Sequence, residues 1–290
     1  MKTGNVLQLI KQNQGRFSNQ QAKIADYILT HHDKAAFLTA TQLAKEADVS
    51  QPTVIRFSQF LGFPQFSMFA SAVQSLLKEE LTSTERLRLS LGDPRAEGRE
   101  ISDDPAEFDI IYKEIRTLER LASTFPHKQF EQLVSQICEC NRIFIVGTRG
   151  SASLTQHFAY FLSKVKSHVI AVDNGATRTY DQLLHLNEKD LVIAIAFPRY
   201  PRETIEIAKF CCRRGATVFG ITDRIESPLA EQAHTSLVIP ITFSTIFDAY
   251  GSAFCLFNML VTRVGRTNSK ESETLSRRFE VLAREVKIFL

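Results

Sequence analysis

No two cysteines in this sequence have the C-x-x-C spacing, although five cysteines occur among its 290 residues. That spacing carries many zinc frameworks and dithiol redox centres, so neither kind of site is expected and no metal is predicted. Cysteines without such spacing are typical of reduced, buried thiols in a cytosolic protein. The five residues are Cys138, Cys140, Cys211, Cys212 and Cys255.

Long apolar runs are also missing. Residues 239–264 come nearest to the roughly 18 apolar residues that a membrane span needs, but they include Asp248, Asn258 and Arg263. The first 14 residues have no continuous apolar stretch of the kind found in a secretory signal peptide. We therefore expect a cytoplasmic protein without a membrane segment, and a hydrophobic content of 44% is enough for a sizeable core.

The length and the charge distribution indicate two domains with different partners. At about 150 residues per domain, 290 residues predict two domains. Residues 1–78 hold 8 basic and 4 acidic residues, a net +4, whereas the remainder holds 27 and 28, a net −1. The positive charge thus lies in the N-terminal part, where phosphate contacts would require it, although the asymmetry is modest.

Residues 39–63 show the pattern of two short helices joined by a tight turn. Thr39 and Gln42 have the spacing of a capping box at the start of the first helix. Asp48 suits the sharp reversal that follows, since Asp tolerates unusual backbone angles. Ser50 is expected to cap the second helix.

The second helix has one apolar and one polar face. Val54, Phe57 and Leu61 recur at helical spacing and predict a buried face. The polar face would project from a compact support, as the recognition helix of a helix-turn-helix does when it enters the DNA major groove. An ordinary helical hairpin with a solvated polar face is the alternative. The candidate DNA-binding residues are Ser50, Gln51, Thr53, Arg56 and Gln59.

The flanking segments complete an all-helical domain over residues 1–80. A capping box of Ser18 with Gln21 predicts a helix before the helix-turn-helix. Phenylalanines near residues 66–69 are expected to pack against the helix-turn-helix. Glycine, proline and scattered charges then interrupt the apolar pattern, so residues 81–106 are predicted to be a linker. Residues 107–290 are the second domain, which begins with helices near 105–123 and 130–139.

Five short and continuous apolar runs begin at Arg142. They alternate with helical stretches at residues 151–166, 177–186 and 201–214, which is typical of strands buried on both faces of a doubly wound parallel sheet. Two helices follow, at residues 244–264 and 269–289, and the last could pack on the sheet or form a dimer contact. The runs are residues 142–147, 168–172, 190–197, 216–222 and 235–240.

Ligands of such sheets bind beyond the C-terminal ends of the strands. The candidate loops are residues 147–153, 173–175 and 197–200. The first loop leads into a helix, whose N-terminal amides and hydroxyls make an anion site. It does not have the G-x-G-x-x-G pattern, and no Gly-Lys-Ser/Thr sequence is present, so a dinucleotide is disfavoured and no cofactor is predicted.

Taken together, the two halves resemble bacterial transcription regulators of the RpiR/MurR type. These combine an N-terminal helix-turn-helix domain with a C-terminal SIS (sugar isomerase) domain. The resemblance covers almost the whole chain and rests on TVIRF and LGF in the first domain and on IFIVGTRGSASL and DLVIAIAFPRY in the second. It implies an all-α domain joined to an α/β domain, a double-stranded DNA operator as partner, and a homodimer or homotetramer.

The resemblance to SIS domains also implies a site for a phosphosugar, although several loop residues of this chain differ from the usual SIS pattern. SIS loops usually resemble G-x-G-x-S and S-x-S-G-x-T. Here Arg149 stands where the second glycine of the first loop would be, and Arg199 stands at the glycine of the second loop, after Ala196 and Pro198 at the serine positions. Since arginine binds phosphate or carboxylate by a two-point contact, we expect both arginines to converge on an anionic effector.

That effector is a sugar phosphate or an acidic carbohydrate derivative. The alternative is that the two arginines pair with local acids such as Glu203 or Asp173. The candidate effector-binding residues are Gly147, Arg149, Gly150, Ser151, Ser153, Arg199 and Tyr200.

The main alternative function is an aldose–ketose isomerase, which needs a positioned base to move a proton between carbons. SIS isomerases resemble one another in supplying a glutamate near the loop after the last strand. Residues 241–248 contain no glutamate, and Asp248 is expected inside the following helix. His157 is expected to pack against Phe161. We therefore expect a regulator with no catalytic residue, whose operator binding depends on a small anionic metabolite.

Overall fold

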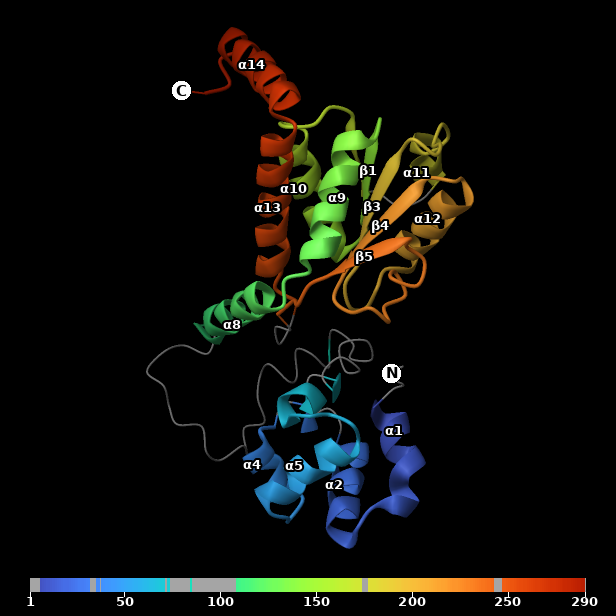
Figure 1. The fold of residues 1–290 in the computed structure, drawn as a ribbon, viewed down its shortest axis with the longest axis vertical. Coiled ribbons are helices and arrows are strands. Elements are labelled where there is room, and N and C mark those ends of the chain that lie inside the picture. The colour runs from blue at the N-terminus through green and yellow to red at the C-terminus, as the bar shows by residue number, and fades with distance from the viewer. Residues whose placement is uncertain are drawn as a thin grey trace. The chain divides into compact units, whose positions relative to one another are not determined.

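The computed structural model describes residues 6–31, 35–36, 38–70, 72–73, 84, 108–173, 177–242 and 247–289. The chain divides into two compact units, residues 1–86 and residues 87–290 (Figure 1). Apart from Thr84, the predicted linker lies outside the described residues, so the two units are described separately.

The first unit is helical. Its elements are α1 (Val6–Asn13), a 3-10 turn (Gln14–Arg16), α2 (Asn19–Thr30), α4 (Ala40–Glu46) and α5 (Gln51–Phe60). The capping box of Ser18 with Gln21 is present at the start of α2, as the sequence predicts. Phe57 is fully buried, and its ring lies 5.2 Å from that of Phe17 and 5.9 Å from that of Phe69. Aromatic packing therefore supports the buried side of α5, as expected.

The second unit is built on a five-stranded, all-parallel sheet in the order β2-β1-β3-β4-β5. Each strand lies inside one of the predicted apolar runs, so the predicted doubly wound α/β fold is confirmed. The strands are β1 (Ile143–Val146), β2 (Val169–Val172), β3 (Leu191–Ile195), β4 (Thr217–Thr222) and β5 (Thr235–Val238).

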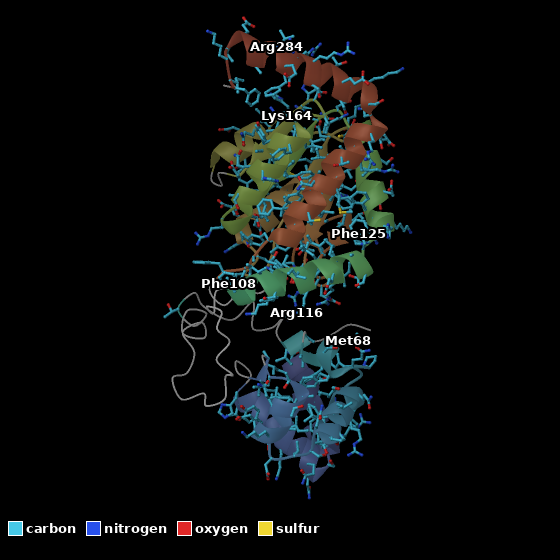
Figure 2. The ribbon with its side chains drawn as sticks, turned by 90° about the vertical axis from the view of Figure 1, so that its left-hand side faces the viewer. Met68, Phe108, Arg116, Phe125, Lys164 and Arg284 are labelled. Carbon is cyan, nitrogen blue, oxygen red and sulfur yellow. The ribbon has the colours of Figure 1, made fainter. Side chains whose placement is uncertain are left out.

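Helices cover both faces of this sheet (Figure 1). One face carries α9 (His127–Glu139), α10 (Gly150–Leu162) and α13 (Gly251–Thr267), with α13 between the other two in Figure 2. The other face carries α11 (Thr177–Gln182) and α12 (Arg202–Arg213). Two further helices, α8 (Asp109–Ser123) and α14 (Ser269–Glu285), pack against α13.

Alternate strand residues belong to different halves of the core. Ile143 and Ile145 of β1 join the cluster beneath α9, α10 and α13, whereas Phe144 and Val146 join the cluster beneath α12. Because both faces are covered, every position of β1 and β3 is apolar, which explains the continuous runs in the sequence.

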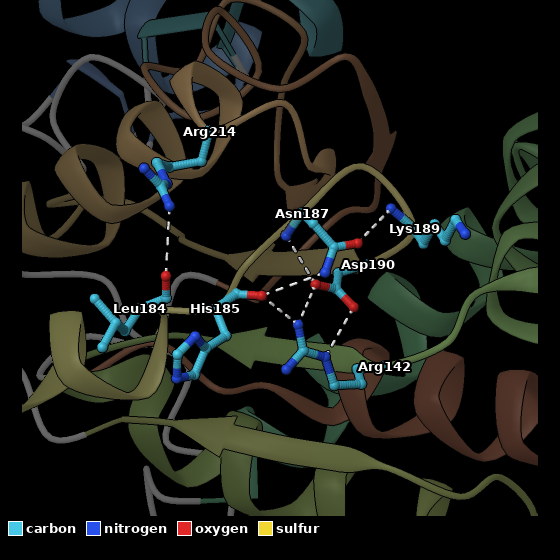
Figure 3. Close-up of polar contacts among 7 residues, drawn as sticks. All are labelled: Arg142, Leu184, His185, Asn187, Lys189, Asp190 and Arg214. Atoms are coloured by element: carbon cyan, nitrogen blue, oxygen red, sulfur yellow. Dashed lines mark hydrogen bonds and ion pairs between the residues drawn. The ribbon is translucent and has the colours of Figure 1, made fainter.

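An ion pair joins the N-terminal ends of β1 and β3 (Figure 3). Arg142 donates from Nε to Asp190 Oδ1 at 2.9 Å and from Nη2 to Asp190 Oδ2 at 2.6 Å. The same Nη2 donates to the His185 carbonyl, and the Asn187 amide donates to Asp190. The Asp190 hydrogen bond raises the pKa of Arg142. This cluster lies at the edge opposite the candidate loops and is internally satisfied, so its role is structural.

The expectation for α13 was wrong at its start. The helix begins at Gly251 rather than at residue 244, so Asp248 precedes it. The reason is a reversal of the chain, since Thr242 and Ala249 form an antiparallel bridge that must close before the helix can start. Ser252 then donates to the Pro240 carbonyl and fastens the first turn of the helix to the end of the preceding segment.

The cysteines and the membrane-span expectation can also be compared with the structure. In the described residues all five cysteines are free thiols, and burial raises the pKa of Cys140 to about 11 and that of Cys211 to about 12. The expected burial holds fully only for Cys211, since Cys138, Cys140 and Cys212 are half-buried and Cys255 is exposed on α13. No helix within the described ranges combines the length and the apolar content that crossing a membrane requires.

Candidate functional site

The turn between α4 and α5 is closed by backbone hydrogen bonds. The Val49 amide donates to the Ala44 carbonyl at 2.9 Å, and the Asp48 amide donates to the Lys45 carbonyl at 3.3 Å. This pattern is a Schellman motif, whose central residue must adopt a left-handed conformation. Asp48 does so with φ of 51°, in agreement with its predicted role. Its carboxylate also accepts from Lys23 Nζ of α2 at 2.9 Å.

Two caps determine where these helices begin. Thr39 and Gln42 form the predicted capping box of α4. Ser50 occupies the N-cap position of α5, but its hydroxyl lies 2.8 Å from the Thr53 hydroxyl instead of capping the backbone, so that part of the prediction was wrong. The Ser50 carbonyl accepts from the Thr53 and Val54 amides, so this start of α5 relies on main-chain bonds.

The faces of α5 are arranged as predicted. Val54 and Phe57 are fully buried and Leu61 is 7% exposed, and these residues face α2 and α4. Within the described part of the chain, the exposed Arg56 guanidinium has no hydrogen-bonding partner. The candidate contact residues Ser50, Gln51, Arg56 and Gln59 are exposed, and Thr53 is half-buried.

The second candidate site lies at the C-terminal ends of β1 and β3, which are neighbours in the sheet. Thr148 follows β1 and Thr204 belongs to α12, which follows β3. The Thr148 amide donates to Thr204 Oγ1 at 3.0 Å, and the two hydroxyls are also 3.0 Å apart. Both side chains are buried, so these bonds tie the first candidate loop to the first turn of α12, which follows the other candidate loop. Thr148 belongs to the predicted first loop, but its pairing with Thr204 was not predicted, because nothing in a sequence pairs residues this far apart.

Close packing explains the glycine at the start of the first loop. A Cβ at Gly147 would lie 2.5 Å from Thr155 Oγ1 and 3.1 Å from the Ser151 Cβ, both on α10. The strand therefore approaches the helix more closely than a side chain would allow. Among the predicted binding residues, Ser151 is 3% exposed, and Ser153 is exposed and donates to the Gly150 carbonyl.

Only some of the backbone amides in this loop are available to bind a ligand. The Ser151 and Ala152 amides donate to the Thr148 and Arg149 carbonyls, at 3.1 Å and 3.0 Å. Within the described residues, the amides of Arg149 and Gly150 have no acceptor. An anion at the N-terminus of α10 would thus meet these two amides and the Arg149 side chain.

Both candidate arginines have a left-handed backbone. Arg149 has φ of 57° and ψ of −126°, and Arg199 has φ of 53°. A Cβ is strained at positive φ, and glycine is the residue that adopts it freely. These are the positions where the SIS pattern has glycine, so the chain keeps the glycine conformation while presenting two exposed guanidinium-bearing side chains.

Tyr200 is tied to the end of β4. Its hydroxyl donates to Asp223 Oδ1 at 2.7 Å and accepts from Arg224 Nε at 3.0 Å. The Arg224 guanidinium also lies over the Tyr200 ring. Burial raises the pKa of Tyr200, and the neighbouring Asp223 carboxylate raises it further. The hydroxyl is therefore engaged in anchoring the loop that carries Arg199.

Tyr250 joins the two loops from the side of α13, and no pattern in the sequence points to it. It is the N-cap residue of α13, and its ring lies 5.6 Å from that of Phe197. A Cβ at Gly150 would lie 3.3 Å from the Tyr250 hydroxyl oxygen. The first turn of α13 therefore borders the candidate site.

His157 packs as predicted. Its ring lies 4.7 Å from that of Phe161 and 4.6 Å from that of Phe254. Burial lowers its pKa, which favours a neutral packing residue over a titrating base. Of the remaining candidate positions, residues 174–175 lie outside the described residues. No group of three possible metal ligands occurs among the residues that the structure describes.

Two family models match the chain, one in each unit. The model described as the helix-turn-helix domain of the rpiR family matches residues 4–80. The model described as the SIS domain matches residues 136–263.

Solved structures support the same division. The sugar isomerase domain of the RpiR transcription factor from Sphaerobacter thermophilus is 19% identical, with a TM-score of 0.59 over 61% of this chain and 99% of that one. The Vibrio vulnificus NanR protein, solved in complex with ManNAc-6P, is 20% identical, with a TM-score of 0.57 over 97% of this chain and 99% of that one. At these identities the comparison establishes the fold.

Proposed function

Because this chain belongs to the RpiR-type transcription regulators, with a helix-turn-helix domain of that family followed by a SIS domain, we propose that α5 reads an operator and that a small anionic carbohydrate derivative controls its binding. The SIS unit is the sensor and the helical unit is the reader. The observation that carries the proposal is the pair of exposed arginines held at positive φ where the SIS pattern has glycine.

DNA recognition rests on the exposed face of α5. Arg56 is the most suitable residue for a base contact, since a guanidinium binds both acceptors of a guanine edge. Gln51 and Thr53 flank it and supply further donors and acceptors. Two copies of α5 must reach half-sites about 34 Å apart, so the protein binds as a homodimer, or as a homotetramer of two dimers, to a partly palindromic operator.

Effector recognition rests on the loops after β1 and β3. Arg149 and Arg199 bind a phosphate or carboxylate group, assisted by the amides of Arg149 and Gly150. Ser151 and Ser153 lie in the first turn of α10, and the ring of Tyr200 borders the same loops. The NanR structure contains ManNAc-6P, so a sugar phosphate is the first compound class to examine.

Selection of genomic DNA fragments tests the regulatory function. Wild-type protein and Arg56→Ala are each incubated with sheared genomic DNA, and the retained fragments are sequenced. A partly palindromic site should be enriched by the wild type and not by the variant, because one lost bidentate contact costs about 1–3 kcal/mol. Equal enrichment by both proteins would remove Arg56 from the interface.

Calorimetric titration tests the effector site. The wild type, Arg149→Ala and Arg199→Ala are titrated with ManNAc-6P, glucose 6-phosphate and glucuronate. We expect at least one of these anions to bind the wild type and each alanine variant to bind it at least about tenfold more weakly. Unchanged affinity in both variants would refute the role of the arginines. Incubation of the same compounds with the protein tests the isomerase alternative, for which we expect no ketose product.

A further inference from the structure

Helix α8 has an apolar face that nothing in the described part of the second unit covers. Its inner side is in contact with α13, where Leu121 is buried and Thr117 accepts a hydrogen bond from Thr242 at 2.6 Å. A different side carries large apolar residues in solvent. They are Phe108, Ile111, Tyr112, Ile115 and Leu118, with exposed fractions between 36% and 53%.

The spacing of this face is that of a helix-pairing seam. Phe108, Ile111, Ile115 and Leu118 follow one another at intervals of 3, 4 and 3 residues. Such a 3-4-3 spacing keeps one narrow stripe of a helix against one partner helix. The polar side of the same helix carries Arg116, which Figure 2 shows on the side of α8 turned away from α13.

We propose that this seam pairs with the same seam of a second copy, so that two antiparallel α8 helices form a dimer interface. The inference rests on the proposed function in one respect, because an operator-binding regulator needs two reading units. It adds the place where the copies meet.

The self-complementarity of the seam favours a second copy as the occupant. A two-fold axis opposite Lys113 brings Phe108 against Leu118 of the partner subunit and Ile111 against Ile115 of the partner subunit. All four seam positions then meet apolar residues at once, which is the defining property of an isologous contact. The helix macrodipoles also favour this arrangement, because two antiparallel helices oppose their dipoles, whereas a parallel pair would align them.

Charge and area agree with this occupant. The helix contains three acidic and three basic residues, so two copies do not repel each other electrostatically. At about 200 Å² for a large side chain, the four seam residues expose roughly 370 Å² of apolar surface. A standard interface buries about 800 Å² on each partner, of which about 65% is apolar in homodimers. The seam thus supplies most of the apolar area that a stable dimer needs.

Sedimentation velocity over a range of concentrations tests the proposal. The variant Ile111→Glu/Ile115→Glu places charges in the seam, and both side chains are exposed in the single copy, so the fold should be retained. We expect its dimer dissociation constant to rise by about 100-fold or more. Arg116→Glu, on the polar side of the same helix, is the matched control and should remain dimeric.

A charge pair tests the register. In the variant Ile111→Glu/Ile115→Lys, antiparallel pairing places each glutamate against a lysine of the partner copy, so the dimer should be about tenfold tighter than that of the double glutamate variant. A parallel pair would set like charges against each other and give no recovery. Absence of recovery would therefore refute the antiparallel register.

Helix α14 supplies the competing surface. Its residue Leu282 and the following Val286 are 50% and 58% exposed, and Leu282→Glu/Val286→Glu changes them in the same way. If this variant is monomeric while the α8 variant remains dimeric, the proposal is wrong but a dimeric regulator stands. If the α8 variant loses operator affinity without any change in mass, the seam binds the DNA-binding unit instead and the proposal is also wrong. A wild-type protein that binds its operator as a monomer would overturn both the seam and the dimeric regulator.

Discussion

Arg149 and Arg199 lie 50 residues apart in the sequence and both have a positive φ, of 57° and 53°, on loops that follow the adjacent strands β1 and β3. A left-handed conformation at a non-glycine residue costs about 1–3 kcal/mol. Two such residues at one edge of a sheet indicate that the side chains are retained for a function other than stability.

Glycine at these two positions should stabilise the protein and abolish effector binding. Arg149→Gly relieves the backbone strain, and we expect the free energy of unfolding to rise by about 1 kcal/mol. Arg149→Ala keeps a Cβ at positive φ and should give no such gain, although it loses the guanidinium equally. Thermal unfolding without ligand separates the two variants, and equal stability of the glycine and alanine variants would contradict the strain at this residue.

The turn of the helix-turn-helix offers a second backbone test. Asp48 has φ of 51° in the Schellman motif after α4. Asp48→Gly should stabilise the protein by up to about 1 kcal/mol, and Asp48→Val should destabilise it by about 1–2 kcal/mol, because a β-branched side chain is strained there. The lost ion pair with Lys23 matters little, since it is largely exposed. Urea denaturation measures both changes, and a stabilising valine would show that the turn has another geometry.

The buried contact between Thr148 and Thr204 should contribute measurably to the stability of the folded protein. Thr204→Val keeps the shape of the side chain but leaves the Thr148 amide and hydroxyl buried without their partner. We expect a loss of about 1–3 kcal/mol in the free energy of unfolding. Thr204→Ser retains the hydroxyl and is the control. Denaturant unfolding of the two variants measures the difference, and equal stability would mean that water replaces the lost bond.

Alkaline pH should reveal the burial of Tyr200. Its pKa in the folded protein is raised above the value of about 10 for an unfolded tyrosine. The corresponding stability is therefore fully present below pH 10 and is lost as the pH rises above it. Between about pH 10 and 11 the unfolding temperature of the wild type should fall more steeply than that of Tyr200→Phe.

The exposed Tyr160 provides the control for that experiment. Tyr160→Phe should keep the steep wild-type dependence, because it leaves Tyr200 in place, and the buried cysteines contribute equally to all three proteins. Parallel curves for the wild type and Tyr200→Phe would mean that Tyr200 ionises as easily in the folded protein as in the unfolded chain.

The local features of this protein were predictable from the sequence, because they depend on neighbouring residues. Thr39 and Gln42 are three residues apart, and that spacing alone specifies a capping box. Val54, Phe57 and Leu61 mark the buried side of α5 by their periodicity, and five continuous apolar runs mark a sheet that is covered on both faces. The glycine positions occupied by Arg149 and Arg199 were also visible in the loop pattern.

Relations between distant residues were decided by the tertiary structure. The bond from Thr148 to Thr204, the approach of Tyr250 to Gly150 and the late start of α13 all depend on how strands and helices stack, and no local pattern encodes them. The same holds for the surface of α8. Its sequence shows an amphipathic helix, but only packing shows that Leu121 and Thr117 face α13. The seam stays in solvent, because a helix can bury only the side that its neighbour covers. The seam residues are Phe108, Ile111, Ile115 and Leu118.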